Sequence, residues 1–238
     1  MKDKIELLRR LVENSRSIVF FGGAGVSTES GIPDFRSTDG LYSQQWAYPP
    51  ETILSRTFFL RYPDEFFRFY REKLMVSGIR PNRAHEVLAR LEHDGKVKAV
   101  ITQNIDGLHQ QAGSENVIEL HGSIHRNYCM ECGIFYPADY VTECGSVPRC
   151  RCGGIVKPDV VLYEESLDTS LLERSARLIR NADLLIIGGT SLSVYPAAGL
   201  IHSYNGRDIV LINKTPTGFD GQAQLLLNGS IGEILGQI

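Results

Sequence analysis

Short apolar runs that alternate with segments of helical periodicity constrain the fold of this chain more than any other feature. The apolar runs span residues 17–21, 96–101, 116–120, 182–187 and 208–212, and helix-like stretches span 4–15, 83–93 and 170–181. Continuously apolar strands separated by helices are typical of a parallel sheet that is covered on both faces, and they argue against a sandwich or a helical bundle. We therefore expect an α/β fold with a doubly wound parallel sheet.

Two stretches interrupt this alternation. Residues 38–78 are rich in aromatic side chains, and residues 123–155 hold the cysteines. Neither stretch is long enough to be stable without packing or a metal, so we expect them to combine into one small lobe. The larger domain would then consist of residues 1–37, 79–122 and 156–238, and the cleft between the two parts would be the default ligand site.

Composition excludes several classes of protein. No apolar run approaches the roughly 20 residues of a membrane-spanning helix, and the first 15 residues lack the apolar core of a secretory signal. The formal net charge of -3 disfavours binding to a nucleic-acid backbone. We expect a cytoplasmic, monomeric protein that binds neither membrane nor nucleic acid.

All five cysteines lie within 24 consecutive positions. Cys129 and Cys132 form a CxxC pair, and Cys150 and Cys152 follow after 17 intervening residues, a spacing close to that of a zinc ribbon. In a reducing compartment such clustering favours a metal over disulfides. Four thiolates leave no open position, so we predict a structural Zn²⁺ ion. Cys144 is the surplus thiol, and it is the alternative to Cys150 or Cys152 as a ligand.

A glycine-rich turn, GGAG at 22–25, follows the first apolar run. Glycines at this place allow a sharp turn and a close approach to a phosphate, and a helix that follows would supply free N–H groups. Thr28 stands where a dinucleotide-binding motif has its third glycine. The alternative is a tight connection with no ligand.

Polar side chains follow two further apolar runs. Gln103, Asn104 and Asp106 come after the run that ends at Ile101, and His121 comes after the run that ends at Leu120. The carboxyl ends of strands are where open α/β sheets bind ligands, and a neutral histidine there is a candidate general base. Helix capping by Asn104 and Asp106, and a structural role for His121, are the alternatives.

The chain resembles the sirtuins, a family of NAD-dependent protein lysine deacylases. The resemblance is carried by GAGVSTESGIPDFR at 23–36, TQNID at 102–106, His121-Gly122, the cysteine segment, GTSL at 189–192 and Ile212-Asn213, in the family's order. It covers nearly the whole chain and implies a Rossmann-like NAD-binding domain with a zinc-containing small lobe. It also implies that acetyl-lysine-containing proteins are the partners of the chain.

The resemblance assigns roles to individual residues. It implies that His121 and Asn104 are catalytic and that the acylated peptide pairs with Val160, Val161, Leu162, Tyr163, Ser193 and Val194. An ordinary strand is the alternative for the run at 157–165. The residues that would bind NAD are Gly23, Ala24, Gly25, Asp34, Phe35, Arg36, Gln103, Asn104, Ile105, Asp106, Gly189, Thr190, Ser191, Asn213 and Ser230, although Ser230 stands where relatives often carry an acidic residue.

The implied reaction moves the acyl group from lysine to ADP-ribose. The acyl oxygen attacks the nicotinamide ribose, nicotinamide leaves, and His121 draws a proton through the ribose hydroxyls. Relatives that prefer acidic acyl groups carry Tyr-x-x-Arg on the inserted helix, and neither Arg68 nor Arg71 has a tyrosine three residues before it. We therefore expect acetyl as the acyl group. Mono-ADP-ribosyl transfer and a non-catalytic NAD-sensing or zinc-ribbon module are the competing hypotheses.

Overall fold

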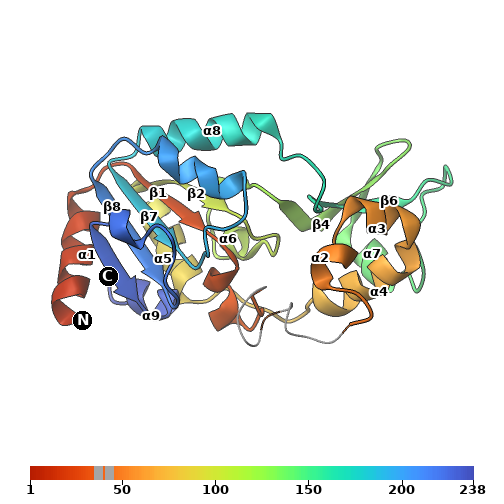
Figure 1. Ribbon diagram of the computed structural model, residues 1–238, viewed down its shortest axis with the longest axis horizontal. Coiled ribbons are helices and arrows are strands. Elements are labelled where there is room, and N and C mark those ends of the chain that lie inside the picture. Colours follow the sequence, from red (N-terminus) through yellow and green to blue (C-terminus); the bar gives the residue numbers. More distant parts are fainter. Residues whose placement is uncertain (35–39, 41–45) are drawn as a thin grey trace.

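A parallel sheet forms the centre of the larger domain in the computed structural model, which describes residues 1–34, 40 and 46–238. Within these residues the sheet has six strands in the order β3-β2-β1-β7-β8-β9 (Figure 1). The strands are β1 (Ile18–Gly22), β2 (Val97–Thr102), β3 (Val117–Glu119), β7 (Leu184–Gly188), β8 (Asp208–Asn213) and β9 (Leu225–Asn228). The predicted doubly wound sheet is confirmed.

Helices cover both faces of this sheet because its central strands, β1 and β7, are buried along their whole length. Helices α1 (Lys2–Asn14), α5 (Arg83–His93) and α9 (Ile231–Leu235) pack on one face, where Leu8 and Leu88 are fully buried. Helix α8 (Thr169–Arg180) and the 3₁₀ segment η4 (Ala197–Ser203) cover the other face. Asp168 caps α8 by accepting the N–H of Ser170 at 2.7 Å.

The turn after β1 differs from the expectation. Two single 3₁₀ turns, η1 (Ala24–Val26) and η2 (Thr28–Ser30), stand where we expected the N-terminus of a helix. Gly31 then adopts a left-handed conformation with φ of 94°, and Pro33 follows it, so the backbone cannot continue as an α-helix. Any anion bound here would meet short turns rather than the dipole of a long helix.

The two inserted stretches form one lobe, as expected. Helices α2 (Pro50–Ile53), α3 (Arg56–Arg61), α4 (Pro63–Lys73) and α7 (Ala138–Glu143) share one hydrophobic core with a three-stranded antiparallel sheet of β5 (Phe135–Pro137), β4 (Gly122–Cys129) and β6 (Val156–Val160). Phe59, Phe66 and Phe67 pack edge to face at centroid distances of 4.8 to 5.9 Å. Trp46, at the border of this core, meets Phe69 edge-on at 4.9 Å.

Two elements lie where sequence reasoning did not place them. Strand β6 belongs to the smaller sheet, although it lies beyond residue 155, where we expected the zinc module to end. Strand β9 follows a segment without clear periodicity and completes the larger sheet. The exact domain boundaries stay a prediction.

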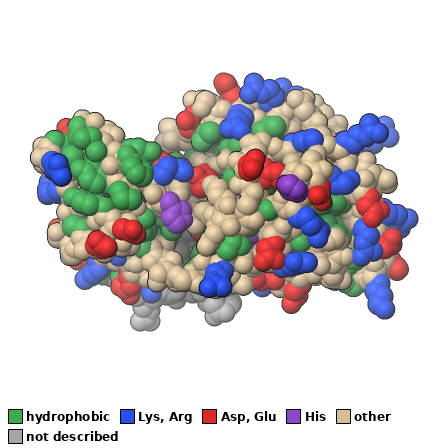
Figure 2. Space-filling model, turned by 180° about the vertical axis from the view of Figure 1, so that it is seen from behind, with side chains coloured by type: hydrophobic (Ala, Val, Ile, Leu, Met, Phe, Trp, Pro, Cys, Tyr) green, Lys and Arg blue, Asp and Glu red, His purple; other side chains and the backbone are tan. Residues whose placement is uncertain are grey.

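Figure 2 shows hydrophobic side chains gathered on one face of the smaller lobe. Ile134 and Phe135 are among the exposed apolar residues of that lobe. The helices of the described residues are all too short or too polar to cross a bilayer.

Candidate active site and metal centre

A cavity of about 860 Å³ lies at the carboxyl ends of β1 and β7 and extends to the smaller lobe. These strands are neighbours in the sheet, and the chain runs outward from them in opposite directions, to β2 on one side and to β8 on the other. Such a reversal of strand order opens a crevice, and open α/β sheets bind ligands there. The cavity is therefore where the fold predicts a ligand.

The glycine turns after β1 and β7 pack directly against each other. The N–H of Gly25 donates to the carbonyl of Gly189 at 2.8 Å. A Cβ atom on Gly25 would lie 2.8 Å from the Cα of Gly189, and one on Gly189 would lie 2.4 Å from the nitrogen of Val26. Gly189 also has a φ of 59°, which favours glycine. Both glycines are required by this backbone contact, whether or not a phosphate approaches them.

A chain of hydrogen bonds connects the first turn to the loop after β2. The amide of Asn104 donates to the hydroxyl of Ser27 at 3.0 Å, and that hydroxyl donates to the carboxylate of Asp106 at 2.6 Å. The other carboxylate oxygen of Asp106 accepts the N–H of Leu108 at 3.0 Å. Ser27 is almost fully buried and was not among the residues we predicted. Its position directly after GAGV is the signal that could have identified it.

His121 lies at the end of β3 with its ring turned into the same cavity. Its Nδ1 atom is 2.9 Å from the carbonyl oxygen of Gln103, which can only accept, so Nδ1 carries the proton of the neutral ring. The lone pair therefore resides on Nε2. Burial lowers the pKa of His121 from its ordinary value of 6.5, although the carbonyl of Gln103 acts in the opposite direction. The ring is neutral near pH 7, as a general base must be.

The buried Nε2 atom of Gln103 has no hydrogen-bond partner within the part of the chain that the structure describes. A buried amide without a partner is costly unless a ligand or water supplies an acceptor. Because Gln103 lines the cavity, a polyhydroxylated ligand such as NAD fits this environment.

Most of the residues predicted to bind NAD line this cavity. They are Ala24, Gly25, Asp34, Gln103, Asn104, Ile105, Asp106, Gly189, Thr190, Ser191 and Asn213. Gly23 and Ser230 do not line it, although Gly229 and Ile231, the neighbours of Ser230, do. Phe35 and Arg36 lie outside the described residues, and their predicted roles are untested.

Asn213 has a structural task in addition to its predicted contact with ribose. Its Oδ1 atom accepts the N–H of Thr190 at 3.1 Å, and its amide donates to the carbonyls of Thr190 and Thr215 at 2.7 and 3.2 Å. Both amide hydrogens are therefore used to hold the loops after β7 and β8 together. A ribose hydroxyl would meet the remaining lone pair of Oδ1.

Both predicted peptide segments contribute residues to the cavity. Val160, Val161, Leu162, Tyr163 and Val194 line it, whereas Ser193 does not and instead pairs with the hydroxyl of Ser191 at 2.7 Å. The segment at 162–165 is fixed to the start of α3. There the N–H of Arg56 donates to the carbonyl of Tyr163 at 3.0 Å, and the N–H of Thr57 donates to the carboxylate of Glu164 at 2.8 Å.

Neither arginine of the inserted helix reaches the cavity. Arg68 pairs with Glu65 on the same helix, and Arg71 donates to the carbonyls of Val141 and Ser146 in the zinc-binding part of the lobe. Lys73, at the end of α4, does line the cavity, with its ammonium group 5.4 Å from the centre of the Trp46 ring. The arginines thus offer no binding site for an acidic acyl group.

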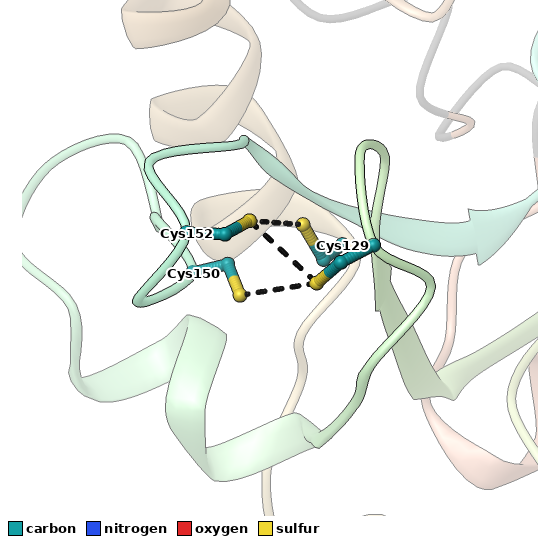
Figure 3. Close-up of side chains that lie close together, drawn as sticks. Cys129, Cys150 and Cys152 are labelled. Atoms are coloured by element: carbon teal, nitrogen blue, oxygen red, sulfur yellow. Dashed lines mark hydrogen bonds between the residues drawn. The ribbon is translucent and has the colours of Figure 1, made fainter.

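Four of the five cysteines converge in the smaller lobe. The sulfurs of Cys129, Cys132, Cys150 and Cys152 all lie within 4.8 Å of one another, and three of the distances between them are 3.4, 3.5 and 3.6 Å. Figure 3 shows the sulfurs of the labelled cysteines turned toward a common centre. A tetrahedral site with zinc–sulfur bonds of about 2.3 Å has sulfurs about 3.8 Å apart, so the donor set fits Zn²⁺. Cys144 lies outside this group, next to Ser146.

Comparison with known proteins agrees with this geometry. Residues 23–196 match the Sir2 family. An NAD-dependent protein deacetylase of Clostridium acetobutylicum is 58% identical, over 98% of this chain and 97% of its own length. A protein of the same description from Clostridium perfringens is 57% identical over 100% of this chain and 99% of its own length.

Solved structures agree as well. One from a study of the mechanism and regulation of Sir2 enzymes has a TM-score of 0.90 and 40% identity, covering 100% of this chain and 96% of that chain. A complex of Sir2 with a p53 peptide and NAD⁺ has a TM-score of 0.86 and 40% identity, and the match covers 97% of this chain and 95% of that chain. On the fold, the sequence motifs and these similarities, the chain belongs to the Sir2 family.

Proposed function

We propose that this protein is an NAD-dependent protein lysine deacetylase that transfers the acetyl group to ADP-ribose and releases nicotinamide. The observation that carries the proposal is a neutral histidine, His121, that is fixed by Gln103 in a cavity shared with Asp106 and the two glycine turns. The same cavity reaches residues 160–163, which continue from β6, the edge strand of the smaller sheet, and we assign the binding of a peptide strand to this segment. One site can thus accept a dinucleotide and a peptide together.

Bound NAD supplies a ribose whose bond to nicotinamide is the one that breaks. Asp106 has its carboxylate oriented by Ser27 and by the N–H of Leu108, and we assign it to the carboxamide of nicotinamide. Asn104 and Gln103 are assigned to the ribose hydroxyls. The Nε2 atom of His121 takes a proton from these hydroxyls as a general base.

Zinc has no part in the chemical step. Its four cysteines would fill the coordination sphere, as in closed structural sites, and would hold the hairpin of β4 to the loop that carries Cys150 and Cys152. This loop precedes β6, which leads into the peptide segment. The ion would therefore stabilise the side of the cavity on which the peptide binds.

Incubation of an acetyl-lysine peptide with the protein and NAD tests the proposal. We expect mass spectrometry to find deacetylated peptide, nicotinamide and acetyl-ADP-ribose in equal amounts, and none of them with His121→Ala. A peptide that stays acetylated while NAD raises the melting temperature would contradict the acyl assignment. A peptide that gains an ADP-ribosyl group would favour mono-ADP-ribosyl transfer instead.

The setting of the enzyme is part of the proposal. The net charge of -3 and the peptide segments of the cavity favour acetyl-lysine-containing proteins over nucleic acid or membrane as partners. We propose a cytoplasmic monomer, which sedimentation of the purified protein and fractionation of cells can test.

A further inference from the structure

A break in the register between β4 and β6 leaves residues 124–126 without partners on β6, although Arg126 still pairs with Pro137 of β5. Gly122 pairs with Val160 and Ser123 with Asp159, but the next pair is Asn127 with Pro158. Three residues of β4, 124–126, are therefore inserted between two pairs whose partners on β6, Asp159 and Pro158, are adjacent in sequence. Such bulges occur beside active sites, where they turn a side chain toward a new partner.

Each residue of this bulge, 124–126, contacts the larger domain. The N–H of Ile124 donates to the carbonyl of Ile105 at 3.0 Å. His125 places its Nε2 atom 2.9 Å from the carbonyl oxygen of Asp106. Arg126 pairs with Glu119 at the end of β3 at 2.7 Å. The bulge thus joins β4 to the loop after β2.

This loop, residues 105–108, separates two cavities. Ile105 and Asp106 line the large one, and Asp106, Gly107 and Leu108 line a second cavity of about 340 Å³, together with His125. Ile105 packs against the core of the smaller lobe and Leu108 is buried, whereas Asp106 lines both cavities. Gly107 has a φ of 72°, and a Cβ atom on it would lie 2.7 Å from the ring of His125. The ring therefore presses directly on the backbone beside Asp106.

We propose that His125 is a positioning residue, which holds the loop at 105–108 so that the carboxylate of Asp106 keeps its orientation toward nicotinamide. Ser27 and Leu108 fix the carboxylate, and His125 fixes the carbonyl of the same residue. The acceptor is a carbonyl, so Nε2 must carry a hydrogen. This inference rests on the proposed function, because it assigns Asp106 to the carboxamide of NAD.

Three substitutions of His125 distinguish the effect of its hydrogen bond to Asp106 from the effect of losing the volume of the ring. Glutamine places an N–H close to the position of Nε2, whereas asparagine reaches only about as far as Nδ1. We expect His125→Gln to retain the Kd for NAD measured by calorimetry, and His125→Asn and His125→Ala to weaken it roughly three- to tenfold. The exchange of labelled nicotinamide into NAD should follow the same order, with the KM for the peptide unchanged. His93→Ala removes an exposed histidine of α5 and serves as the control.

The outcomes are distinguishable. Equal affinity for NAD in the glutamine and asparagine variants would overturn the inference, as would a change confined to the peptide KM. If the wild type binds NAD but releases no nicotinamide with an acetylated peptide, the proposed function fails. The order of the NAD affinities would still decide whether His125 positions the loop.

Discussion

At the scale of single residues, the site depends on which atoms carry protons. Partial burial keeps His121 neutral near pH 7, and the carbonyl of Gln103 decides which of its nitrogens acts as the base. His85 and His109 lie nearby with their rings 4.7 Å apart, and burial lowers the pKa of both, that of His85 to about 4. They are therefore neutral across the range in which the enzyme would work.

The lowered pKa of His121 predicts the pH dependence of the reaction. A general base acts only when it is unprotonated, so the rate should fall when the pH falls through the pKa of His121 in the folded protein. Because that pKa lies below 6.5, we expect the acid limb of kcat/KM below pH 6.5 and full activity at pH 7. A pH profile with a midpoint clearly above 6.5 would show that another group limits the reaction.

Loss of the Ser27 hydroxyl should weaken the binding of NAD and leave the general base, His121, unchanged. Ser27→Ala removes the donor to Asp106 and leaves the amide of Asn104 without its acceptor. Hydrogen bonds to charged groups contribute about 1.5 to 3 kcal/mol, so we expect the KM for NAD to rise about tenfold or more. Thr142→Ala, which removes an exposed hydroxyl of α7 that does not line the cavity, is the control. An unchanged KM for NAD in the Ser27 variant would remove Ser27 from the site.

At the scale of elements, sequence periodicity located five of the six strands in the larger sheet within one or two residues. Strand β9 was missed because its apolar run is only three leucines long, and its pairing with β8 identifies it as a strand. Pro158 and the charged residues around it favoured an exposed segment between the lobes, with a strand as the alternative. The pairing of β6 with β4 shows that residues 156–160 form a strand of the smaller sheet.

The sequence motifs predicted which residues would lie together in the site, but not the hydrogen bonds between them. The carboxyl ends of β1, β2, β3 and β7 bring most of the predicted residues to one cavity because parallel strands end at the same edge. The hydrogen bonds of Ser27 with Asn104 and Asp106 and the bulge at 124–126 depend on contacts between segments far apart in sequence. Local sequence patterns do not predict such contacts.

Because the two glycine turns are in direct contact, a single methyl group added at Gly25 should lower the stability of the protein. Gly25→Ala forces a Cβ to within 2.8 Å of the Cα of Gly189, and backbone atoms on both sides must move. Overpacking of this kind costs about 1 to 3 kcal/mol, and we expect a lower free energy of unfolding together with weaker NAD binding. Gly218→Ala, where a Cβ would have no neighbour within 4 Å, should change neither. Equal denaturation midpoints for the two variants would contradict this account.

At the scale of the whole molecule, two parts with differently built cores contribute residues to one cavity. The larger domain is stabilised by a sheet with helices on both faces, whereas the smaller lobe combines an aromatic cluster with the four cysteines. The loop that supplies Cys150 and Cys152 has little apolar surface of its own, so a metal there contributes directly to folding. The two parts should therefore respond differently to loss of the ion.

Removal of zinc should unfold the smaller lobe first. We expect one equivalent of zinc in the purified protein, and a strong chelator should lower the affinity for the peptide before it melts the larger sheet. Cys129→Ser should lose the metal, and Cys144→Ser, outside the cluster, should retain it. Metal analysis with circular dichroism would check this, and equal zinc content in both variants would contradict the assigned ligands.

The single tryptophan of the chain gives the smaller lobe an optical signal of its own. Trp46 stands edge-on to Phe69 and beside the ammonium group of Lys73, which lines the cavity. Indole emission therefore originates entirely in this lobe, whereas the far-ultraviolet signal comes mostly from the larger domain. Comparison of the two spectra during ligand binding or heating would follow each half of the enzyme separately, without any label.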